Sequence, residues 1–132
     1  MPTLKVHHIG YLVKKMDKAV QIFKDLGYHI FQDTMYDDIR KVHICFLQKD
    51  GYTVELISPA AEDSVVSGLM KKYKNSPYHI CYETSAFEQD YQMLLTSGFT
   101  AIDTPTPAPA LQNRDVVFLM SSSAGMIELL KK

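Results

Sequence analysis

Hydrophobic and polar residues alternate in the same order in the two halves of the chain. Alternation in "HHIGYLV" (residues 7–13) predicts a half-buried strand, and "YHICYET" (residues 78–84) repeats it. Further strand-like segments follow in each half, separated by turn residues such as "YDD", "KDG" and "SSSAG". They are "YHIFQDT", "KVHICFLQ" and "YTVELIS" in the first half, and "FTAIDT", "DVVFLMS" and "MIELLKK" in the second.

A helix is predicted after the first strand of each half, because apolar residues recur there at helical spacing. Asp17 is expected to cap the first helix and Gly27 to end it. Ser85 and Glu88 would form a capping box for the second helix, which is expected to end at Gly98. In both halves this glycine comes 19 residues after a histidine of the first strand. Each half is therefore predicted to be a β-α-β-β-β module.

The expected organisation is a single domain over residues 1–132, with one module at about 4–58 and a second at about 78–131. The connecting residues 59–77 are predicted to contain a short helix with one apolar face. The residues of that face are Val65, Val66, Leu69, Met70 and Tyr73. In the second half, the proline-rich segment "TPTPAPALQN" is interpreted either as a lid or as a rigid connector.

The charge balance argues against a protein that binds nucleic acid or an anionic membrane. Lys and Arg number 14 and Asp and Glu number 15, so the net charge is −1. No segment approaches the roughly 20 apolar residues that span a bilayer. Strand-like sequence from Leu4 leaves no room for a signal peptide, so a cytoplasmic protein is expected. Cys45 and Cys81 lie in apolar runs and are expected to be buried, reduced thiols.

Four polar residues recur at matched places in the two halves. His8 and His79 lie in the first strand of each half, and Glu55 and Glu128 lie in the last. The histidine and the glutamate are 47 residues apart in the first half and 49 in the second. Because strand side chains alternate between faces, each of the four is expected to point away from the face that a helix covers. Two imidazoles and two carboxylates suit a divalent transition metal.

Taken singly, these residues have simpler interpretations. A glutamate in a last strand is more often exposed to solvent, and a histidine in an apolar strand is more often a satisfied core residue than a ligand. His7 and His43 are expected at the edge of the core or at the surface, and His29 at the surface. The joint pattern, and no single residue, favours a metal site over a structural role.

The segments "HHIG", "VELISP", "PYHICYE", "NRDVVFL" and "GMIELL" resemble the vicinal oxygen chelate superfamily, in particular its glyoxalase I and methylmalonyl-CoA epimerase branch. The resemblance extends from Lys5 to Leu130. It implies an α+β fold in which two βαβββ modules form a cup-shaped mixed sheet, the glyoxalase/bleomycin resistance/dihydroxybiphenyl dioxygenase fold. It also implies a metal on the floor of the cup, a small-molecule substrate and a homodimer.

The resemblance assigns roles to four residues. His8, Glu55, His79 and Glu128 match the metal ligands of the family, and the metal is expected to be Ni, Co or Zn. Glu128 is the expected catalytic base, with Glu55 as the second catalytic carboxylate. Glyoxalase I enzymes typically have glutamate at the position of Glu55, where bacterial methylmalonyl-CoA epimerases have glutamine. The resemblance therefore favours a lactoylglutathione lyase-like enzyme (glyoxalase I) for methylglyoxal detoxification, which isomerises a methylglyoxal–thiol hemithioacetal to a 2-hydroxyacyl thioester.

Other functions stay open at this point. A methylmalonyl-CoA epimerase-like enzyme would use the same enolate chemistry, and a non-enzymatic antibiotic-binding module would share the fold without the metal ligands. A ring-cleaving dioxygenase is less favoured, because Glu55 would fill a place that oxygen chemistry needs. Many glutathione-using glyoxalases have arginine and asparagine where this chain has Leu12 and Pro59, which leaves the thiol open. Arg114 is interpreted as a contact to an anionic substrate group or as a solvated loop residue. Cys81 would line the cup or stay a buried structural thiol.

Overall fold

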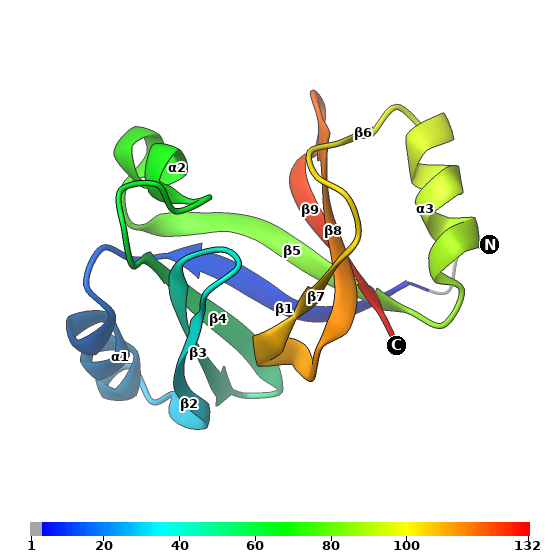
Figure 1. The fold of residues 1–132 in the computed structure, drawn as a ribbon. Coiled ribbons are helices and arrows are strands. Elements are labelled where there is room, and N and C mark those ends of the chain that lie inside the picture. Colours follow the sequence, from blue (N-terminus) through cyan, green and yellow to red (C-terminus); the bar gives the residue numbers. More distant parts are fainter. Residues whose placement is uncertain (1–3) are drawn as a thin grey trace. The chain divides into compact units, whose positions relative to one another are not determined.

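The computed structural model describes residues 4–132, and these fold into helices and strands in two compact units (Figure 1). One unit is His8–Tyr78, called here the N-terminal unit; the other, the C-terminal unit, combines the residues up to His7 with His79–Lys132. The elements in chain order are β1 (Lys5–Leu12), α1 (Met16–Asp25), β2 (His29–Asp37), β3 (Val42–Lys49), β4 (Tyr52–Pro59), α2 (Ser67–Tyr73), β5 (Ser76–Thr84), α3 (Phe87–Thr96), β6 (Thr100–Ala101), β7 (Thr106–Ala108), the 3₁₀ turn η1 (Pro109–Leu111), β8 (Arg114–Ser121) and β9 (Gly125–Lys131).

The N-terminal unit confirms the order β-α-β-β-β predicted for the first half. Its strands lie in the order β2-β3-β4-β1, with β3 antiparallel to both β2 and β4, and β1 parallel to β4. The helix α1 covers one face of this sheet because Val20 and Phe23 pack against a core that includes Leu47 and Leu56. The side chains of β1 that point to the other face, such as His8, do not pack against α1 and are available for a functional site.

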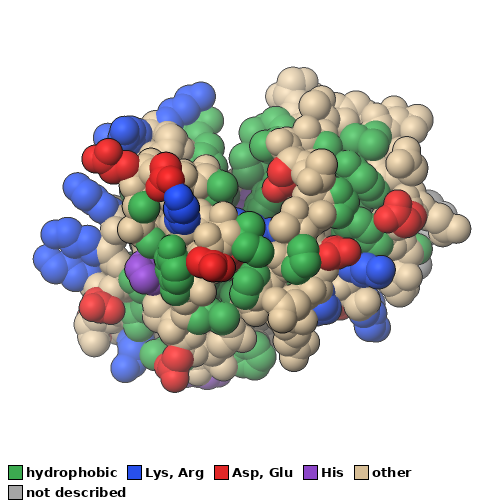
Figure 2. Space-filling model, in the orientation of Figure 1, with side chains coloured by type: hydrophobic (Ala, Val, Ile, Leu, Met, Phe, Trp, Pro, Cys, Tyr) green, Lys and Arg blue, Asp and Glu red, His purple; other side chains and the backbone are tan. Residues whose placement is uncertain are grey.

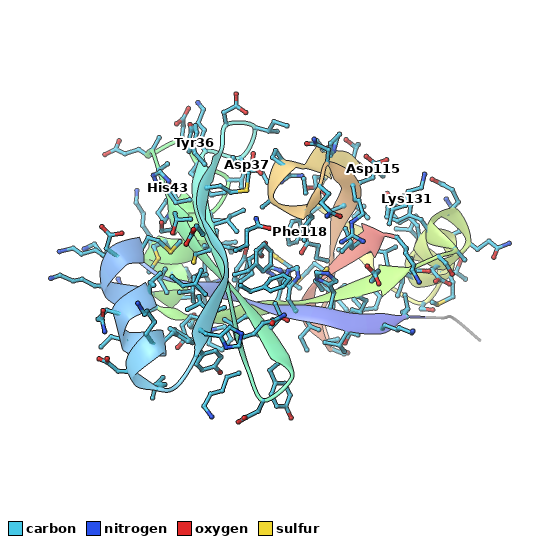
Figure 3. All side chains as sticks on the ribbon, turned by 90° about the horizontal axis from the view of Figure 1, so that it is seen from below. Tyr36, Asp37, His43, Asp115, Phe118 and Lys131 are labelled. Carbon is cyan, nitrogen blue, oxygen red and sulfur yellow. The ribbon has the colours of Figure 1, made fainter. Side chains whose placement is uncertain are left out.

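A buried aspartate fixes the turn between β2 and β3. The Asp37 carboxylate accepts hydrogen bonds from the backbone N–H groups of Ile39 and Arg40, each at 3.0 Å, and from Arg40 Nη1. The next pair along the ladder is Tyr36 and His43, whose rings lie 5.5 Å apart between centroids (Figure 3). The sequence predicted a turn at "YDD" (residues 36–38). In the structure β2 continues through Asp37 and the turn follows it, so the strand is longer than predicted.

The C-terminal unit has the strand order β5-β9-β8-β6, and β7 also pairs with β8. β5 is parallel to β9, as β1 is to β4 in the other unit, and β8 and β9 are antiparallel. The helix α3 buries Phe87 and Leu94 against Val117 and Leu129, and Leu4 packs on the same cluster. The core of this unit therefore includes a residue from the start of the chain.

The second strand predicted for the second half is replaced by two short strands. The segment "FTAIDT" contributes only Thr100–Ala101, and the proline-rich segment supplies β7. Between them, the Asp103 carboxylate accepts a hydrogen bond from the Phe118 N–H at 2.9 Å, so a side chain satisfies a donor at the break. Prolines have no N–H to donate to a ladder, which limits them to such edge positions. Pro107 is paired with Asp115 of β8, so this part of the proline-rich segment is held in the sheet, as the rigid-connector interpretation expects.

Both helix starts differ from the prediction, whereas both ends are confirmed. The N-cap of α1 is Lys15 and that of α3 is Ala86, and neither makes a side-chain capping bond. Asp17 therefore lies inside the first turn, and the capping box of Ser85 with Glu88 was wrong. The Thr84 hydroxyl instead accepts the Ala86 N–H and donates to the buried Asp90. The glycines that follow α1 and α3, Gly27 and Gly98, have φ of 101° and 104°, which glycine adopts without strain.

The connecting helix exists, but its apolar face is not buried as predicted. None of the residues of α2 is buried, and Tyr73 is 48% exposed. Of the predicted face, Val66 at the N-cap is buried, whereas Val65 is 63% exposed. A helix of seven residues has too few turns to present a continuous apolar stripe to a core.

Candidate metal centre

His8 and Glu55 form a buried pair in the N-terminal unit. The register of the parallel strands β1 and β4 sets Gly10 opposite Glu55. His8 precedes Gly10 by two residues, so its side chain lies on the same face as that of Glu55. The His8 Nε2 atom lies 3.3 Å from Glu55 Oε1, and the two residues are 1% and 4% exposed.

His79 and Glu128 form the corresponding pair in the C-terminal unit. The parallel strands β5 and β9 set Cys81 opposite Glu128, and His79 again precedes the opposed residue by two positions. The His79 Nε2 atom lies 3.2 Å from Glu128 Oε1, and each residue is 4% exposed. The two units thus place histidine and glutamate in the same register, which explains the repeated spacing in the sequence.

Each pair packs against a phenylalanine that the sequence analysis missed. Phe46 of β3 lies opposite the glutamate of the first pair, and Phe118 of β8 lies opposite that of the second. The rings of His8 and Phe46 meet edge to face with centroids 5.3 Å apart, and those of His79 and Phe118 do so at 5.1 Å. These contacts restrict the orientation of the imidazole rings. The available signal was an aromatic residue in the strand before each glutamate strand, in "HICFL" and "VVFLM".

The donor chemistry of each pair fits a divalent metal. An imidazole nitrogen and a carboxylate oxygen are ligand atoms that Zn and neighbouring transition metals accept. A carboxylate with 4% exposure has lost most of its water and needs a compensating positive charge. A metal cation would supply that charge.

Arg114 is held by a carboxylate that the sequence analysis did not single out. Arg114 Nη1 donates a hydrogen bond to Glu83 Oε2 at 2.6 Å, and Arg114 Nε donates to the Leu111 carbonyl at 3.2 Å. The side chains of Arg114 and Glu83 are 25% and 21% exposed. The hydrogen bond from Arg114 holds the pKa of Glu83 below its ordinary value, against the opposing effect of burial. Arg114 is therefore neither a solvated loop residue nor free for an anion unless it leaves Glu83.

Replacing Glu83 with glutamine is expected to lower the free energy of unfolding by about 1 kcal/mol at neutral pH. The pKa of Glu83 is lower in the folded protein than in the unfolded chain, so its contribution is present above the unfolded pKa. It is lost as the pH falls through the lowered folded pKa. Urea denaturation of both proteins at neutral and strongly acidic pH measures this. An equal difference at both pH values would show that the carboxylate charge plays no part, and Glu88→Gln, on the exposed side of α3, is the matched control.

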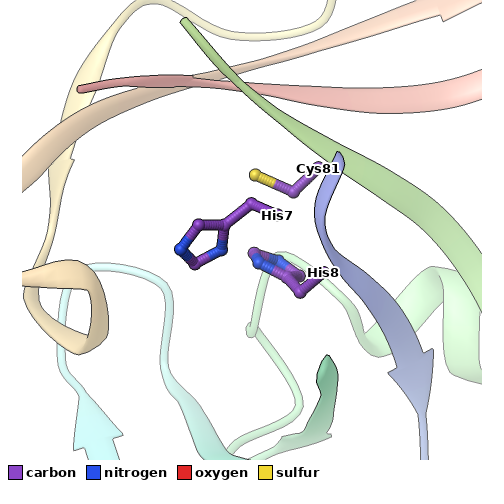
Figure 4. Close-up of side chains that lie close together, drawn as sticks. All are labelled: His7, His8 and Cys81. Atoms are coloured by element: carbon purple, nitrogen blue, oxygen red, sulfur yellow. The ribbon is translucent and has the colours of Figure 1, made fainter. Parts of the chain in front are cut away.

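The remaining histidines and cysteines lie mostly as expected. Cys45 and Cys81 are both fully buried, and His29 is exposed. His7 is half-buried and belongs to the same unit as Cys81; donor atoms of the two lie within 4.8 Å of one another (Figure 4). His7 thus brings a further imidazole close to the face of β5 that carries His79.

The two departures from the glutathione-using pattern are apolar side chains at strand ends. Leu12 ends β1 and is fully buried. Pro59 ends β4 and is paired with Val42 of β3. Neither residue can donate a hydrogen bond from its side chain to a polar substrate group.

No helix in residues 4–132 is long and apolar enough to cross a membrane. A family model described as the glyoxalase/bleomycin resistance protein/dioxygenase superfamily matches residues 7–118. No curated protein matches the chain with statistical significance.

Several solved structures have a similar fold. A hypothetical protein from Bacillus halodurans C-125 is 22% identical with a TM-score of 0.85, covering 98% of this chain and 95% of that one. Methylmalonyl-CoA epimerase from Mycobacterium tuberculosis is 20% identical with a TM-score of 0.82, covering 96% of this chain and 86% of that one. A variant of the Streptomyces coelicolor epimerase in complex with 2-nitronate-propionyl-CoA is 21% identical with a TM-score of 0.81, covering 97% and 94%. At these identities the likeness concerns the fold.

Proposed function

Because the chain belongs to the glyoxalase/bleomycin resistance protein/dioxygenase superfamily, we propose that it is a metal-dependent enzyme that moves a proton between carbon atoms next to a carbonyl group. Members of this superfamily are commonly enzymes and generally bind divalent metals. The two units are proposed to form one domain. In it, His8, Glu55, His79 and Glu128 together hold a single Ni, Co or Zn ion. The support is the common register of the two pairs, their burial and their donor atoms.

The metal, when bound, would supply a Lewis acid that stabilises negative charge developing on substrate oxygens. The chain supplies the groups that move the proton. Glu128 takes the proton from C1 of the substrate, and a glutamate carboxylate returns a proton to C2, with Glu55 available for this step. His8 and His79 would hold the metal beside the two carboxylates, and burial keeps water from competing for the proton.

The favoured substrate is the hemithioacetal of methylglyoxal with a low-molecular-weight thiol. Moving its C1 proton to C2, together with the hydroxyl proton from the C1 oxygen to the C2 oxygen, gives a 2-hydroxyacyl thioester with no change in overall composition. The observation that carries this choice is Glu55, since it gives both halves a carboxylate in the same register. A glutamine there would leave only one half with a group able to accept a proton at neutral pH.

An epimerase for methylmalonyl-CoA is the second candidate. It would use the same proton removal and return at the carbon between a thioester and a carboxylate. Its support is the similarity in fold to methylmalonyl-CoA epimerases and the apolar Leu12 and Pro59, which do not suit glutathione. An antibiotic-binding module is supported less, since the chain carries all four donors. Cytoplasmic localisation and a homodimer stay predictions.

A substrate panel on one preparation tests the proposal. The protein is stripped with a chelator and reloaded with Ni, Co or Zn. Each form is then given methylglyoxal with glutathione, cysteine or CoA, or methylmalonyl-CoA in D₂O. We expect thioester formation from at least one hemithioacetal, lost on chelation and restored by metal. Deuterium exchange into methylmalonyl-CoA without any hemithioacetal turnover would replace the first candidate by the second. Neither reaction in the loaded protein would overturn both.

A further inference from the structure

A pocket of about 350 Å³ opens on the N-terminal unit at the start of α1. That volume is within the range of small-molecule sites. Its residues come from the end of β1, from the connection between β1 and α1, from α1, and from the segment after α2. They are Tyr11, Val13, Lys14, Lys15, Lys18, Ala19, Ile22, Phe23 and Asn75.

The pocket combines a cationic rim with an apolar wall. Lys14, Lys15 and Lys18 all line it, and none of its lining residues is acidic. In the described residues 4–132, none of these three lysines forms an ion pair. Figure 2 shows basic side chains along this margin of the unit, over α1 and α2. Within residues 4–132, these three charges therefore have no carboxylate within ion-pair distance, although Asp17 lies in the same turn of α1.

The apolar wall of the pocket includes a side chain that does not contribute to the core. Ile22 is 58% exposed, although it lies on an amphipathic helix whose other apolar side chains pack inward. Phe23 also lines the pocket. Its ring is held by edge-to-face contacts with Tyr11 and Tyr28, with ring centroids 5.3 and 5.1 Å away, respectively. The wall is thus preformed and needs little ordering to receive an apolar group.

Asn75 gives the rim a fixed polar group. The Lys14 N–H donates a hydrogen bond to Asn75 Oδ1 at 2.8 Å, which ties residues 61 positions apart in the chain. The side-chain amide N–H₂ of Asn75 remains a donor, like the three lysines. The polar groups offered by the side chains of Asn75 and the lysines are therefore donors suited to an anion.

The pocket is separate from the proposed metal site. On β1, Tyr11 points to the face that α1 covers, and His8 points to the opposite face. Neither His8 nor Glu55 lines the pocket. Occupation of the pocket therefore does not require the metal, and failure of the proposed function would leave this inference standing.

We propose that this pocket binds a small amphipathic anion: an aliphatic or aromatic group that covers Ile22 and Phe23, carrying a carboxylate or a phosphate that meets the lysines. The lysines favour a negatively charged ligand by charge complementarity, and the exposed apolar wall favours an apolar group on the same ligand. This binding site is separate from the proposed catalytic site, because it lies on the face of β1 opposite to that of His8.

Titration of ¹⁵N-labelled protein with decanoate, decyl phosphate and decanol tests the proposal. We expect saturable amide shifts at Tyr11, Ala19, Ile22 and Asn75 with one or both anions, weakened by salt, and much smaller shifts with decanol. The two anions distinguish a carboxylate ligand from a phosphate ligand. Shifts that map elsewhere, or equal binding of decanol, would overturn the proposal.

Exposed lysines give variants that keep the fold. Lys15→Gln with Lys18→Gln is expected to raise the Kd of the better anion about tenfold, because two of the three charges are removed. Lys24→Gln, on the same helix but outside the pocket, is the matched control and is expected to change the Kd less than about twofold. Equal Kd values for the double variant and the control would refute a role for the cationic rim. Metal content of all three proteins is expected to be unchanged.

Discussion

Replacing Glu128 with glutamine is expected to lower turnover of the accepted substrate by roughly 10²–10⁴, the usual contribution of a positioned general base. The amide cannot accept a proton at neutral pH, yet its oxygen can still act as a metal ligand, so metal is expected to stay bound at least in part. Turnover and metal content measured on one preparation separate the two effects. Because Glu128 is buried and contacts His79, the fold of the variant is checked by its thermal transition.

The chain contains good controls for this substitution. Glu88→Gln makes the same chemical change at an exposed position of α3 and is expected to leave turnover intact. Glu55→Gln makes it at the repeat-related position and reproduces the glutamine of the epimerase pattern. If Glu128→Gln retains the turnover of the unmodified enzyme, Glu128 is not the base. Loss of hemithioacetal turnover in Glu55→Gln, with epimerase activity kept, would support the role given to Glu55.

Replacing His79 with alanine is expected to weaken metal binding by at least about 100-fold, since even loss of a group that supports a ligand costs 10–100-fold in affinity. The proposed shared site makes a sharper prediction about stoichiometry. The unmodified chain should retain one metal, and either His79→Ala or His8→Ala should lose most of it under the same conditions. Metal content after dialysis against a weak chelator measures this.

Two independent pairs would behave differently. If each unit bound its own metal, the unmodified chain would hold two ions and each single variant would keep one. That result would contradict the shared centre without affecting the family assignment. His43→Ala is the matched control, because this half-buried histidine of β3 packs on Tyr36 and is not a proposed ligand.

The repeat could be predicted because its causes are local in the sequence. Alternation identifies strands from side-chain direction alone, and a glycine at positive φ ends each helix, as at Gly27 and Gly98. The residues of both His–Glu pairs could be identified for the same reason, from their matched places in the strands. Their contacts depend on which strands become neighbours and in what register, which the linear pattern does not contain.

The missed features depend on contacts between residues distant in the chain. Thr84 replaced the predicted cap at Ser85 because it also reaches Asp90. Arg114 meets Glu83, which is 31 residues away, only once β5, β9 and β8 are assembled. The contacts of Phe46 and Phe118 with the histidines were not predicted, because an aromatic side chain in a strand carries no chemical signal of its own.

The division of β1 between the two units limits how the protein can be taken apart. Its residues up to His7 group with the second half of the chain, and Leu4 packs on the core beneath α3. If the chain were cut in the connecting segment, the N-terminal fragment would carry the start of β1, which groups with the C-terminal unit. The C-terminal fragment would lack Leu4, which packs on its core. The two pieces would depend on each other for complementation, even though the sequence reads as a tandem repeat.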